Sequence, residues 1–218
     1  VQHQWHIDPA QYERHEARRG RRHAFERLEP MATALVVVDL VPFFVDDNPY
    51  AAGVVANVNR LAAALRAAGG VVAWVVPANV PSPPMHDEFF GETIASIYAA
   101  SGGSGPVRDR LAPALEPSDA DLFVEKSAAS AFFPGRCDLH QRIRERDIEN
   151  VIVVGTLANV CCESTVRDAN TLGYRVVMVA DANAAGSDAE LNATLHTVYR
   201  SFGDVRPTDE VIGLLDGA

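Results

Sequence analysis

The 218-residue sequence is poor in two residue types, lysine and cysteine. It contains 18 arginines but a single lysine, Lys126, and only three cysteines. Three cysteines cannot form a closed disulfide framework, so we expect free thiols and a cytoplasmic location. The lone lysine reflects either a coding bias with one exception or a position that requires a compact ammonium group.

Long apolar runs and positive charge are also lacking. No apolar run approaches the roughly 20 residues that a membrane-spanning helix needs, so we expect no membrane partner. The net charge is −10 at pH 7, which argues against a nucleic-acid partner held by its phosphates. No G-x-G-x-x-G motif follows a predicted strand, so a nucleotide-binding module is the weaker interpretation of this fold.

Short apolar runs do occur, and they alternate with helical patterns. Buried strands are predicted at residues 33–40, 70–77, 120–126, 151–155 and 174–181. Helices are predicted at residues 54–70 and 137–150, after residue 155 through Tyr174, and at 188–203. This alternation is typical of a parallel sheet covered on both faces. We therefore predict an α/β fold for residues 31–218: a three-layer α/β/α sandwich with a mainly parallel, Rossmann-like sheet of about six strands.

Residues 1–30 differ from the rest because they are polar, rich in arginine and without a sustained apolar period. We interpret them as an N-terminal arm. Its scattered apolar side chains need a surface to cover them: Trp5, Ile7, Tyr12, Phe25 and Leu28. We predict a homo-oligomer, a dimer or tetramer, in which the arm packs across a subunit boundary. The alternative is that the arm docks along its own subunit.

Three residues with chemical potential follow predicted strands. Asp39 ends the first strand, Lys126 ends the third, and Gly155 ends the fourth and leads to the stretch GTLANVCCEST (155–165). In parallel sheets, ligands bind beyond the carboxyl ends of the strands. Each residue alone has an ordinary structural explanation, as a turn, surface or core residue. An acid, the only lysine and a cysteine at one edge together indicate a site.

The two adjacent cysteines have different predicted positions, and a disulfide between neighbours has poor geometry. With Asn159 as the helix N-cap, Cys162 shares an apolar face with Val166 and Ala169. Cys161 is turned away from this face, at a helix start where free N–H groups lower the pKa of a thiol. Cys161 is therefore the predicted reactive residue and Cys162 the packing residue. A shift of one residue in the helix start would exchange them.

Several stretches resemble the isochorismatase-like cysteine hydrolase superfamily over residues 32–206. They read ALVVVDL (34–40), VEKSAASAFF (124–133) and GTLANVCCESTVRDANTLGYRVVMVADA (155–182). By motif position, the resemblance implies a catalytic triad of Asp39, Lys126 and Cys161. It also implies a cis peptide near Thr156–Leu157 and an oxyanion hole formed by the backbone N–H groups of Leu157 and Cys161.

The resemblance implies a cysteine-dependent hydrolase that cleaves an amide, carbamoyl or ureido C–N bond of a small molecule through a thioester. Asp39 would accept the thiol proton, Cys161 would attack the carbonyl, and Lys126 would supply fixed positive charge. One alternative is vinyl-ether hydrolysis of the isochorismatase type, but those enzymes are understood to work without the cysteine. The other is a non-catalytic binding or redox member of the fold.

Some positions depart from members of this superfamily. Nicotinamidases carry an Asp-x-His metal-binding pair after the catalytic Asp, whereas residues 45–53 read VDDNPYAAG and contain no histidine. We therefore expect no metal and no other cofactor. Val41 also stands where the family often has Gln.

Substrate specificity is expected to lie in two irregular segments, the proline-rich residues 77–92 and the glycine-rich residues 100–106. Aromatic and polar side chains near the predicted strand ends are candidates for the substrate pocket. These are Phe44, Asn79, Phe132 and Phe133, with Phe89 and Phe90 as further candidates. Core packing is the alternative role of each aromatic residue.

Overall fold

The computed structural model of the chain describes residues 1–215. Its centre is a six-stranded sheet in the order β3-β2-β1-β4-β5-β6, and every neighbouring pair is parallel. The strands are β1 (Thr33–Val38), β2 (Val71–Pro77), β3 (Leu122–Lys126), β4 (Asn150–Thr156), β5 (Arg175–Ala184) and β6 (Asp204–Arg206). The predicted parallel sheet is confirmed, and β6 is the strand that the sequence patterns did not locate.

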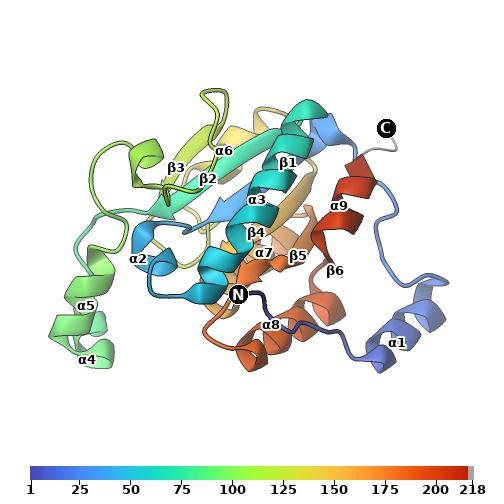
Figure 1. Cartoon of the computed structure of the whole chain (residues 1–218), viewed down its shortest axis with the longest axis horizontal. Helices are drawn as coiled ribbons and strands as arrows, with labels where there is room; N and C mark the ends of the chain where they lie inside the picture. The colour runs from blue at the N-terminus through green and yellow to red at the C-terminus, as the bar shows by residue number, and fades with distance from the viewer. Residues whose placement is uncertain (216–218) are drawn as a thin grey trace.

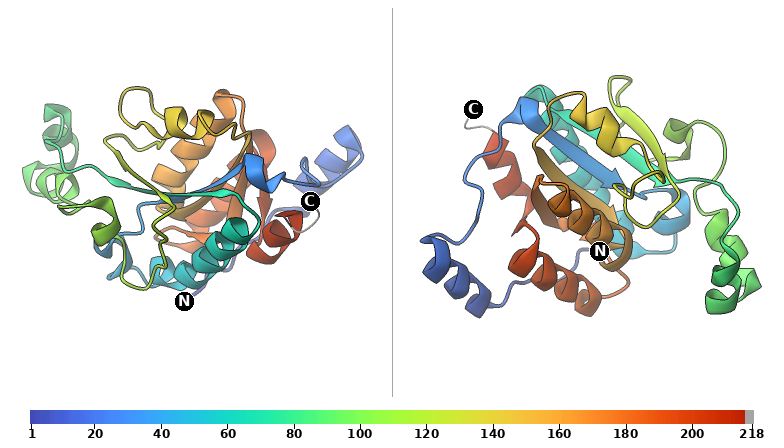
Figure 2. Two further views of the ribbon diagram at one scale, coloured as in Figure 1. Left: turned by 90° about the horizontal axis from the view of Figure 1, so that it is seen from above. Right: turned by 180° about the vertical axis from the view of Figure 1, so that it is seen from behind.

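Helices cover both faces of the sheet, as Figures 1 and 2 show. One face carries α3 (Pro49–Ala67) and α9 (Thr208–Leu215), and the other carries α6 (Leu139–Arg144), α7 (Glu163–Thr171) and α8 (Asp188–Ser201). The remaining helices are α1 (Pro9–Arg19), α2 (Pro42–Val45), α4 (Pro84–Phe90) and α5 (Glu92–Ala99). The predicted three-layer sandwich is thereby confirmed. Within residues 1–215, no helix is long and apolar enough to cross a membrane.

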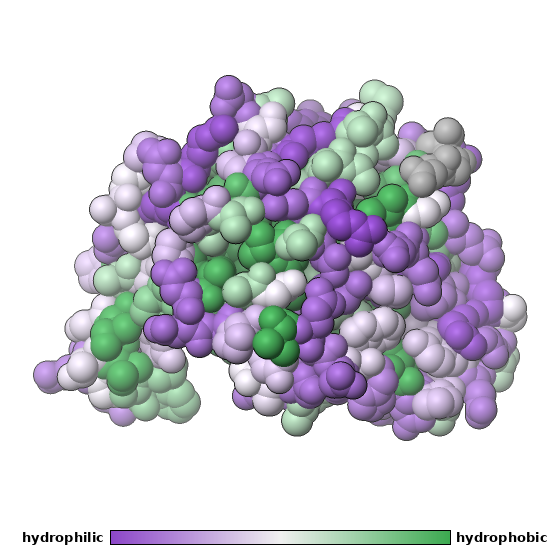
Figure 3. Space-filling model, in the orientation of Figure 1, coloured by the Kyte–Doolittle hydropathy of each residue, from purple (hydrophilic) through white to green (hydrophobic). Residues whose placement is uncertain are grey.

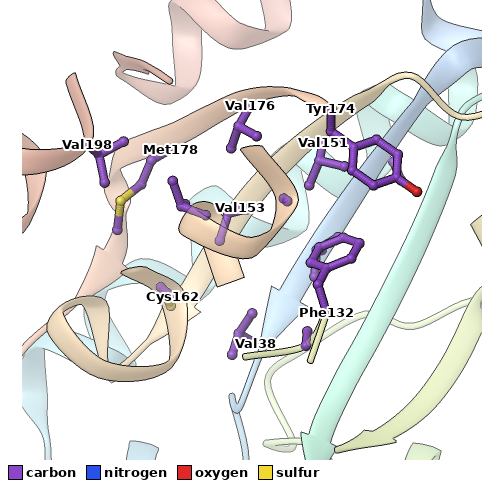
Figure 4. Close-up of a cluster of buried hydrophobic side chains, with 14 of the residues drawn as sticks. Val38, Phe132, Val151, Val153, Cys162, Tyr174, Val176, Met178 and Val198 are labelled. Carbon is purple, nitrogen blue, oxygen red and sulfur yellow. The ribbon is translucent and has the colours of Figure 1, made fainter. Parts of the chain in front are cut away.

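Two apolar cores lie on the two faces of the sheet, because successive residues of a strand point in opposite directions. In β1, Val36 and Val38 face the core beneath α7 and α8, whereas Leu35 and Val37 face the core beneath α3. Every residue of β1 is buried, as expected of a central strand covered on both sides. Figure 4 shows part of the first core, which includes Cys162.

Two predicted segments differ from the structure. The helix predicted at residues 137–150 covers only Leu139–Arg144, because the chain turns at Asp147 with a left-handed φ of 55° before it enters β4. Residues 77–92 were expected to be irregular. They leave β2 in an extended form, but α4 and α5 then form a helical hairpin that projects from the domain (Figure 1).

The arm docks along its own subunit, which is the alternative to the predicted packing across a subunit boundary. Ile7 and Leu28 are buried against the two cores of the same chain. The carboxylate of Asp204 accepts hydrogen bonds from the backbone N–H groups of Ala24 and Phe25. The apolar side chains of the arm therefore find their cover within one chain.

Candidate active site

Asp39 follows β1 in an unusual backbone conformation. Its φ is 53°, in the left-handed region that a residue with a side chain seldom adopts. Its N–H still donates to the carbonyl of Val75 in β2, at 2.9 Å, so the residue remains attached to the sheet. The Asp39 side chain is only 1% exposed, and its carboxylate meets Lys126.

Lys126 is the last residue of β3 and lies next to both other predicted triad members. Its Nζ is 2.8 Å from Asp39 Oδ2 and 3.5 Å from Cys161 Sγ, and it donates to the Ala128 carbonyl at 3.1 Å. Lys126 as a whole is 4% exposed. The only lysine of the chain is therefore a buried cation between a carboxylate and a thiol.

Cys161 arrives at this cluster through a tight connection after β4. Gly155 has a φ of 122°, and a Cβ at this position would lie 2.1 Å from the Val38 carbonyl oxygen. Only glycine therefore allows β4 to approach the end of β1 this closely. The cis peptide that the resemblance implied is present between Thr156 and Leu157.

A π-helical turn, Ala158–Cys162, carries both cysteines and continues into α7. The predicted N-cap Asn159 is wrong, because the turn begins at Ala158. The residue before it, Leu157, accepts hydrogen bonds at its carbonyl from Val160 and Cys162. π-turns inside helices occur frequently at functional sites.

The two cysteines nevertheless lie on the faces predicted for them. Cys162 is 0% exposed and packs in the first core with Val166 and Ala169, as Figure 4 shows for Cys162 itself. Cys161 is half-buried and faces Lys126. The structure therefore brings Asp39, Lys126 and Cys161 together and turns the Cys162 side chain into the apolar core.

The acidity of Cys161 differs from the expectation. Burial, and then the negative charge of Asp39, raise the pKa of the Cys161 thiol to about 12, and the nearby Lys126 ammonium only partly offsets this. The prediction that the helix start lowers the pKa of the Cys161 thiol is wrong, because the effect of desolvation is larger. Cys161 therefore carries its proton at neutral pH.

The two charged partners of Cys161 stabilise each other. Burial raises the pKa of the Asp39 carboxyl, and the positive charge of Lys126 lowers it in part. Burial lowers the pKa of Lys126, but Asp39 and Cys161 outweigh this effect, so that its pKa is raised overall. The arrangement is a buried ion pair beside a neutral thiol.

Two features beside the cysteine complete the site. The Leu157 N–H has no hydrogen-bond acceptor within residues 1–215, so it is free to bind an oxygen of a ligand. Thr165 Oγ1 donates to the Cys161 carbonyl at 2.7 Å and accepts from the Ala131 N–H at 3.1 Å. Thr165 was not recognised as a site residue, although it lies one helical turn after Cys161.

The four predicted pocket residues do not line one common cavity. Phe132 is buried and borders a cavity of about 670 Å³ at the edge of β3, together with Cys137 and Arg142. Asn79 borders a different cavity, of about 460 Å³, beside α5. Phe44 is half-buried against the core beneath α3, and Phe133 is exposed. The structure therefore does not bring these four residues together in one cavity, and their part in substrate binding stays a prediction.

Among the residues that the structure describes, no group of three or more His, Cys, Asp or Glu side chains is placed to hold a metal ion. The expected absence of a metal stays a prediction that chelation can test.

Comparison with known proteins agrees with this geometry. The sequence profile of the isochorismatase domain matches residues 33–210, most of the chain. The chain belongs to the isochorismatase family. It is 31% identical to the ureidoacrylate amidohydrolase RutB of Agrobacterium fabrum over 214 residues, covering 88% of this chain and 93% of the relative.

Solved structures of this family show the same fold. A cysteine hydrolase from Pseudomonas syringae pv. phaseolicola has a TM-score of 0.75 and 29% identity, over 87% of this chain and 95% of the other. The N-carbamoylsarcosine amidase of Thermoplasma acidophilum has a TM-score of 0.67 and 27% identity, over 81% and 96%. The predicted family, fold and hydrolase class are confirmed by these relatives.

Proposed function

We propose that the protein hydrolyses an amide, carbamoyl or ureido C–N bond of a small molecule, with Cys161 as the nucleophile. The observation that carries this proposal is the buried contact of Asp39, Lys126 and Cys161 at the carboxyl edge of the sheet. Two isochorismatase-family relatives bear names of C–N hydrolases, which supports it. All three cysteines are free, which suits a reducing, cytoplasmic compartment.

The first step of the proposed mechanism forms a carbon–sulfur bond. The thiol proton of Cys161 moves to the Asp39 carboxylate as sulfur attacks the carbonyl carbon of the substrate. Because the pKa of Cys161 is raised, we expect proton transfer and attack to occur together. The carbonyl oxygen becomes an oxyanion, which the Leu157 and Cys161 N–H groups would stabilise.

The second step breaks the C–N bond. The oxyanion collapses, and the nitrogen leaves as ammonia or an amine that takes the proton from Asp39. The acyl group stays on Cys161 as a thioester. Water then attacks the thioester while Asp39 accepts its proton, and the acid product leaves as that proton returns to the Cys161 sulfur.

Lys126 has an electrostatic role in both steps. Its ammonium group contacts the carboxylate and the sulfur at the same time. During attack, negative charge moves from the Asp39 carboxylate through the Cys161 sulfur to the carbonyl oxygen of the substrate. A fixed cation that contacts both the carboxylate and the sulfur stabilises the negative charge before and during this transfer. A point charge suits this position better than the planar fork of an arginine.

The test is a panel of small amides, carbamoyl amino acids and ureido acids, assayed for release of ammonia. We expect at least one to be hydrolysed and a covalent acyl adduct on Cys161 to be detectable by mass spectrometry after rapid acid quenching. Cys161→Ala is the control and should form no adduct. Turnover of vinyl ethers with no C–N substrate accepted would contradict the proposal.

Metal independence is tested on the same substrate. Because residues 45–53 contain no histidine, we expect the full rate to survive exhaustive chelation. Loss of turnover that zinc or manganese restores would overturn this expectation.

We also propose that the chain forms a homo-oligomer, with the α4–α5 hairpin (residues 84–99) as its interface. Six apolar side chains of the hairpin are 41 to 78% exposed: Met85, Phe89, Phe90, Ile94, Ile97 and Tyr98. The hairpin lies at the lower left of Figure 1, and the same corner of Figure 3 shows hydrophobic surface among hydrophilic residues. At roughly 150–250 Å² for a fully exposed side chain of this size, the exposed parts of all six, in two copies, together reach about 1,200 Å², the lower limit for a stable interface.

Light scattering on single variants tests this interface. Phe89→Glu should yield monomers, because it places a charge in the centre of the covered surface. Met31→Glu is the matched control, since Met31 is as exposed as Phe89 but lies before β1. A monomeric wild-type protein would reject the oligomer, and an unchanged oligomer in Phe89→Glu would reject the hairpin as its interface.

A further inference from the structure

The first residues of the arm form an ordered strap, residues 3–7, across the start of α8. The backbone N–H of Gln4 donates to Asp188 at 3.2 Å, and its carbonyl accepts from Asn192 at 3.0 Å. The N–H of His6 donates to the same Asn192 at 2.8 Å. Polar contacts on the first turns of one helix therefore fix the strap in position.

The side chain of His3 is buried and has a partner at each ring nitrogen. It is 2% exposed and stacks on Tyr50 with 3.7 Å between ring centres. Its Nε2 is 3.1 Å from the Ala185 backbone nitrogen, and its Nδ1 is 2.6 Å from Asp188 Oδ1. An amide N–H can only donate, so Nε2 must be the acceptor and Nδ1 must carry the hydrogen that Asp188 accepts.

Both backbone polar groups of Ala185 are hydrogen-bonded to side chains. Its N–H is bound by His3, and its carbonyl accepts from the side chain of Asn48 at 3.3 Å. Asn48 is itself fixed, because it caps α3 by accepting from the N–H groups of Tyr50 and Ala51. The side chains of His3 and Asn48, from distant parts of the sequence, therefore fix the loop after β5 in position.

Ala185 lies one residue after the strand residue that pairs with the connection between β4 and Cys161. Ala184, the last residue of β5, pairs with Thr156 in the sheet. The Thr156 hydroxyl also donates to the Ala184 carbonyl at 3.3 Å. The next residue is Leu157, whose N–H has no acceptor within residues 1–215. A continuous series of bonded contacts therefore leads from His3 to the Leu157 N–H.

We propose that His3 is a positioning residue for the oxyanion hole: by holding the Ala185 N–H, it fixes Ala184 and Thr156 and thereby aims the Leu157 N–H. This inference rests on the proposed function for its catalytic consequence. The contacts themselves do not depend on the substrate. The arm thus contributes to catalysis from outside the isochorismatase domain match, which begins at residue 33.

Three variants separate positioning from simple attachment of the arm. His3→Phe keeps the stacking on Tyr50 but loses both hydrogen bonds. His3→Gln restores an acceptor for Ala185 and a donor for Asp188. His6→Phe makes the same type of change on an exposed side chain of the same strap and serves as the control.

Two readouts are measured on each variant. Removing an oxyanion donor costs about 10²–10³-fold in kcat, so misaiming one should cost about tenfold. We expect His3→Phe to lower kcat about tenfold with KM changed less than about twofold, and His3→Gln to recover most of the loss. We also expect faster amide hydrogen exchange at residues 156–158 and 184–187 in His3→Phe, but unchanged exchange in α1.

The two readouts fail in different ways. If no C–N substrate is turned over by the wild-type protein, the proposed function is lost, and hydrogen exchange still decides the role of His3. Exchange at residues 156–158 that is unchanged in His3→Phe would overturn the proposal. So would a kcat equal to that of His6→Phe, or a loss in His3→Phe that His3→Gln does not recover at all.

Discussion

Cys161 and Cys162 are neighbours in the chain but belong to two different regions of the molecule. Cys161 contacts a cluster of charged groups at the end of the sheet, with Lys126 Nζ at 3.5 Å. Cys162 lies in the apolar core beneath α7 (Figure 4). Burial raises the pKa of both thiols. What distinguishes them is the Lys126 ammonium, itself paired with the Asp39 carboxylate, which contacts the sulfur of Cys161.

This difference bears on what the proposed reaction requires of a buried cysteine. A thiol whose pKa is raised needs a nearby proton acceptor, and in the proposed mechanism this is Asp39, whose carboxylate contacts the same Lys126 ammonium as the Cys161 sulfur. The Cys162 side chain packs in the apolar core and makes no hydrogen bond within the described residues, so its proton has no comparable acceptor. The following predictions test whether the charged region performs the chemistry and the apolar region only supports it.

The largest effect is expected from exchanging the two cysteines for alanine in turn. Cys161→Ala should lower kcat/KM about 10⁴-fold or more, because no other nucleophile replaces the sulfur. Cys162→Ala should keep kcat/KM within about threefold and lower the free energy of unfolding by about 1 kcal/mol through a small cavity. Steady-state kinetics and denaturant unfolding measure both. If activity is lost in Cys162→Ala and kept in Cys161→Ala, Cys162 and not Cys161 is the nucleophile.

The second effect concerns the charge that separates the two thiols. Asp39→Asn should lower kcat/KM about 10³-fold, because the proton acceptor is lost. It should also lower the pKa of Cys161 from about 12, since the negative charge that raises it is removed while Lys126 remains. The rate of thiol alkylation against pH, read for each cysteine by mass spectrometry, measures this shift.

Asp121→Asn is the matched control for this change. Asp121 is another carboxylate paired with a cation, Arg66, on the opposite face of the sheet. Its replacement should leave the alkylation profile of Cys161 unchanged. A Cys161 pKa that stays the same or rises in Asp39→Asn would show that the carboxylate does not control the thiol.

Most of the charged region was predictable from sequence. Asp39 and Lys126 follow apolar runs, and strands of a parallel sheet present their carboxyl ends at one edge. The helical period placed Cys162 with Val166 and Ala169, and all three are buried. These inferences depend on local periodicity and topology, which the sequence encodes directly.

Other features depend on contacts between distant segments, and periodicity does not report these. The raised pKa of Cys161 comes from desolvation in the folded chain. His3 meets Ala185 only because the arm docks along its own subunit. Residues 77–92 were expected to be irregular because of their prolines, but Pro84 occupies the first position of α4, where proline is tolerated.

A third, smaller effect is expected in the pH profile of kcat/KM. Burial raises the pKa of Asp39, and the protonated carboxyl cannot accept the thiol proton. Activity should therefore fall, as the pH is lowered, at a higher pH than the ordinary carboxyl value of about 3.9. Lys126→Met removes the charge that lowers this pKa, so the acidic limb should move to still higher pH, with kcat about 10²-fold lower.

Cys162→Ala is the control for the pH profile and should follow the wild-type curve. Removing one partner of a buried ion pair destabilises proteins by about 3–5 kcal/mol, so Lys126→Met must be assayed where unfolding measurements show it to be folded. An acidic limb that moves to lower pH in Lys126→Met would contradict the assigned electrostatics.

The smallest effect separates two neighbouring residues of α7, one from each region. Thr165 links the Cys161 carbonyl to the Ala131 N–H, whereas Val166 lies wholly in the apolar core. Thr165→Val should lower kcat/KM about three- to tenfold and the free energy of unfolding by about 1–2 kcal/mol, because the Ala131 N–H loses its acceptor. Thr165→Ser should restore both values, since it keeps the hydroxyl.

Val166→Ala is the matched variant and should lower the free energy of unfolding by about 2 kcal/mol without changing kcat/KM. Both variants lose stability to a similar degree, so a difference in kinetics cannot come from the folded fraction. It must come from the position of Cys161, to which only Thr165 is bonded. If Val166→Ala lowers kcat/KM as much as Thr165→Val, the apolar core also positions Cys161. The difference in role between Cys161 and Cys162 would then not hold for Thr165 and Val166, the next pair of neighbours in α7.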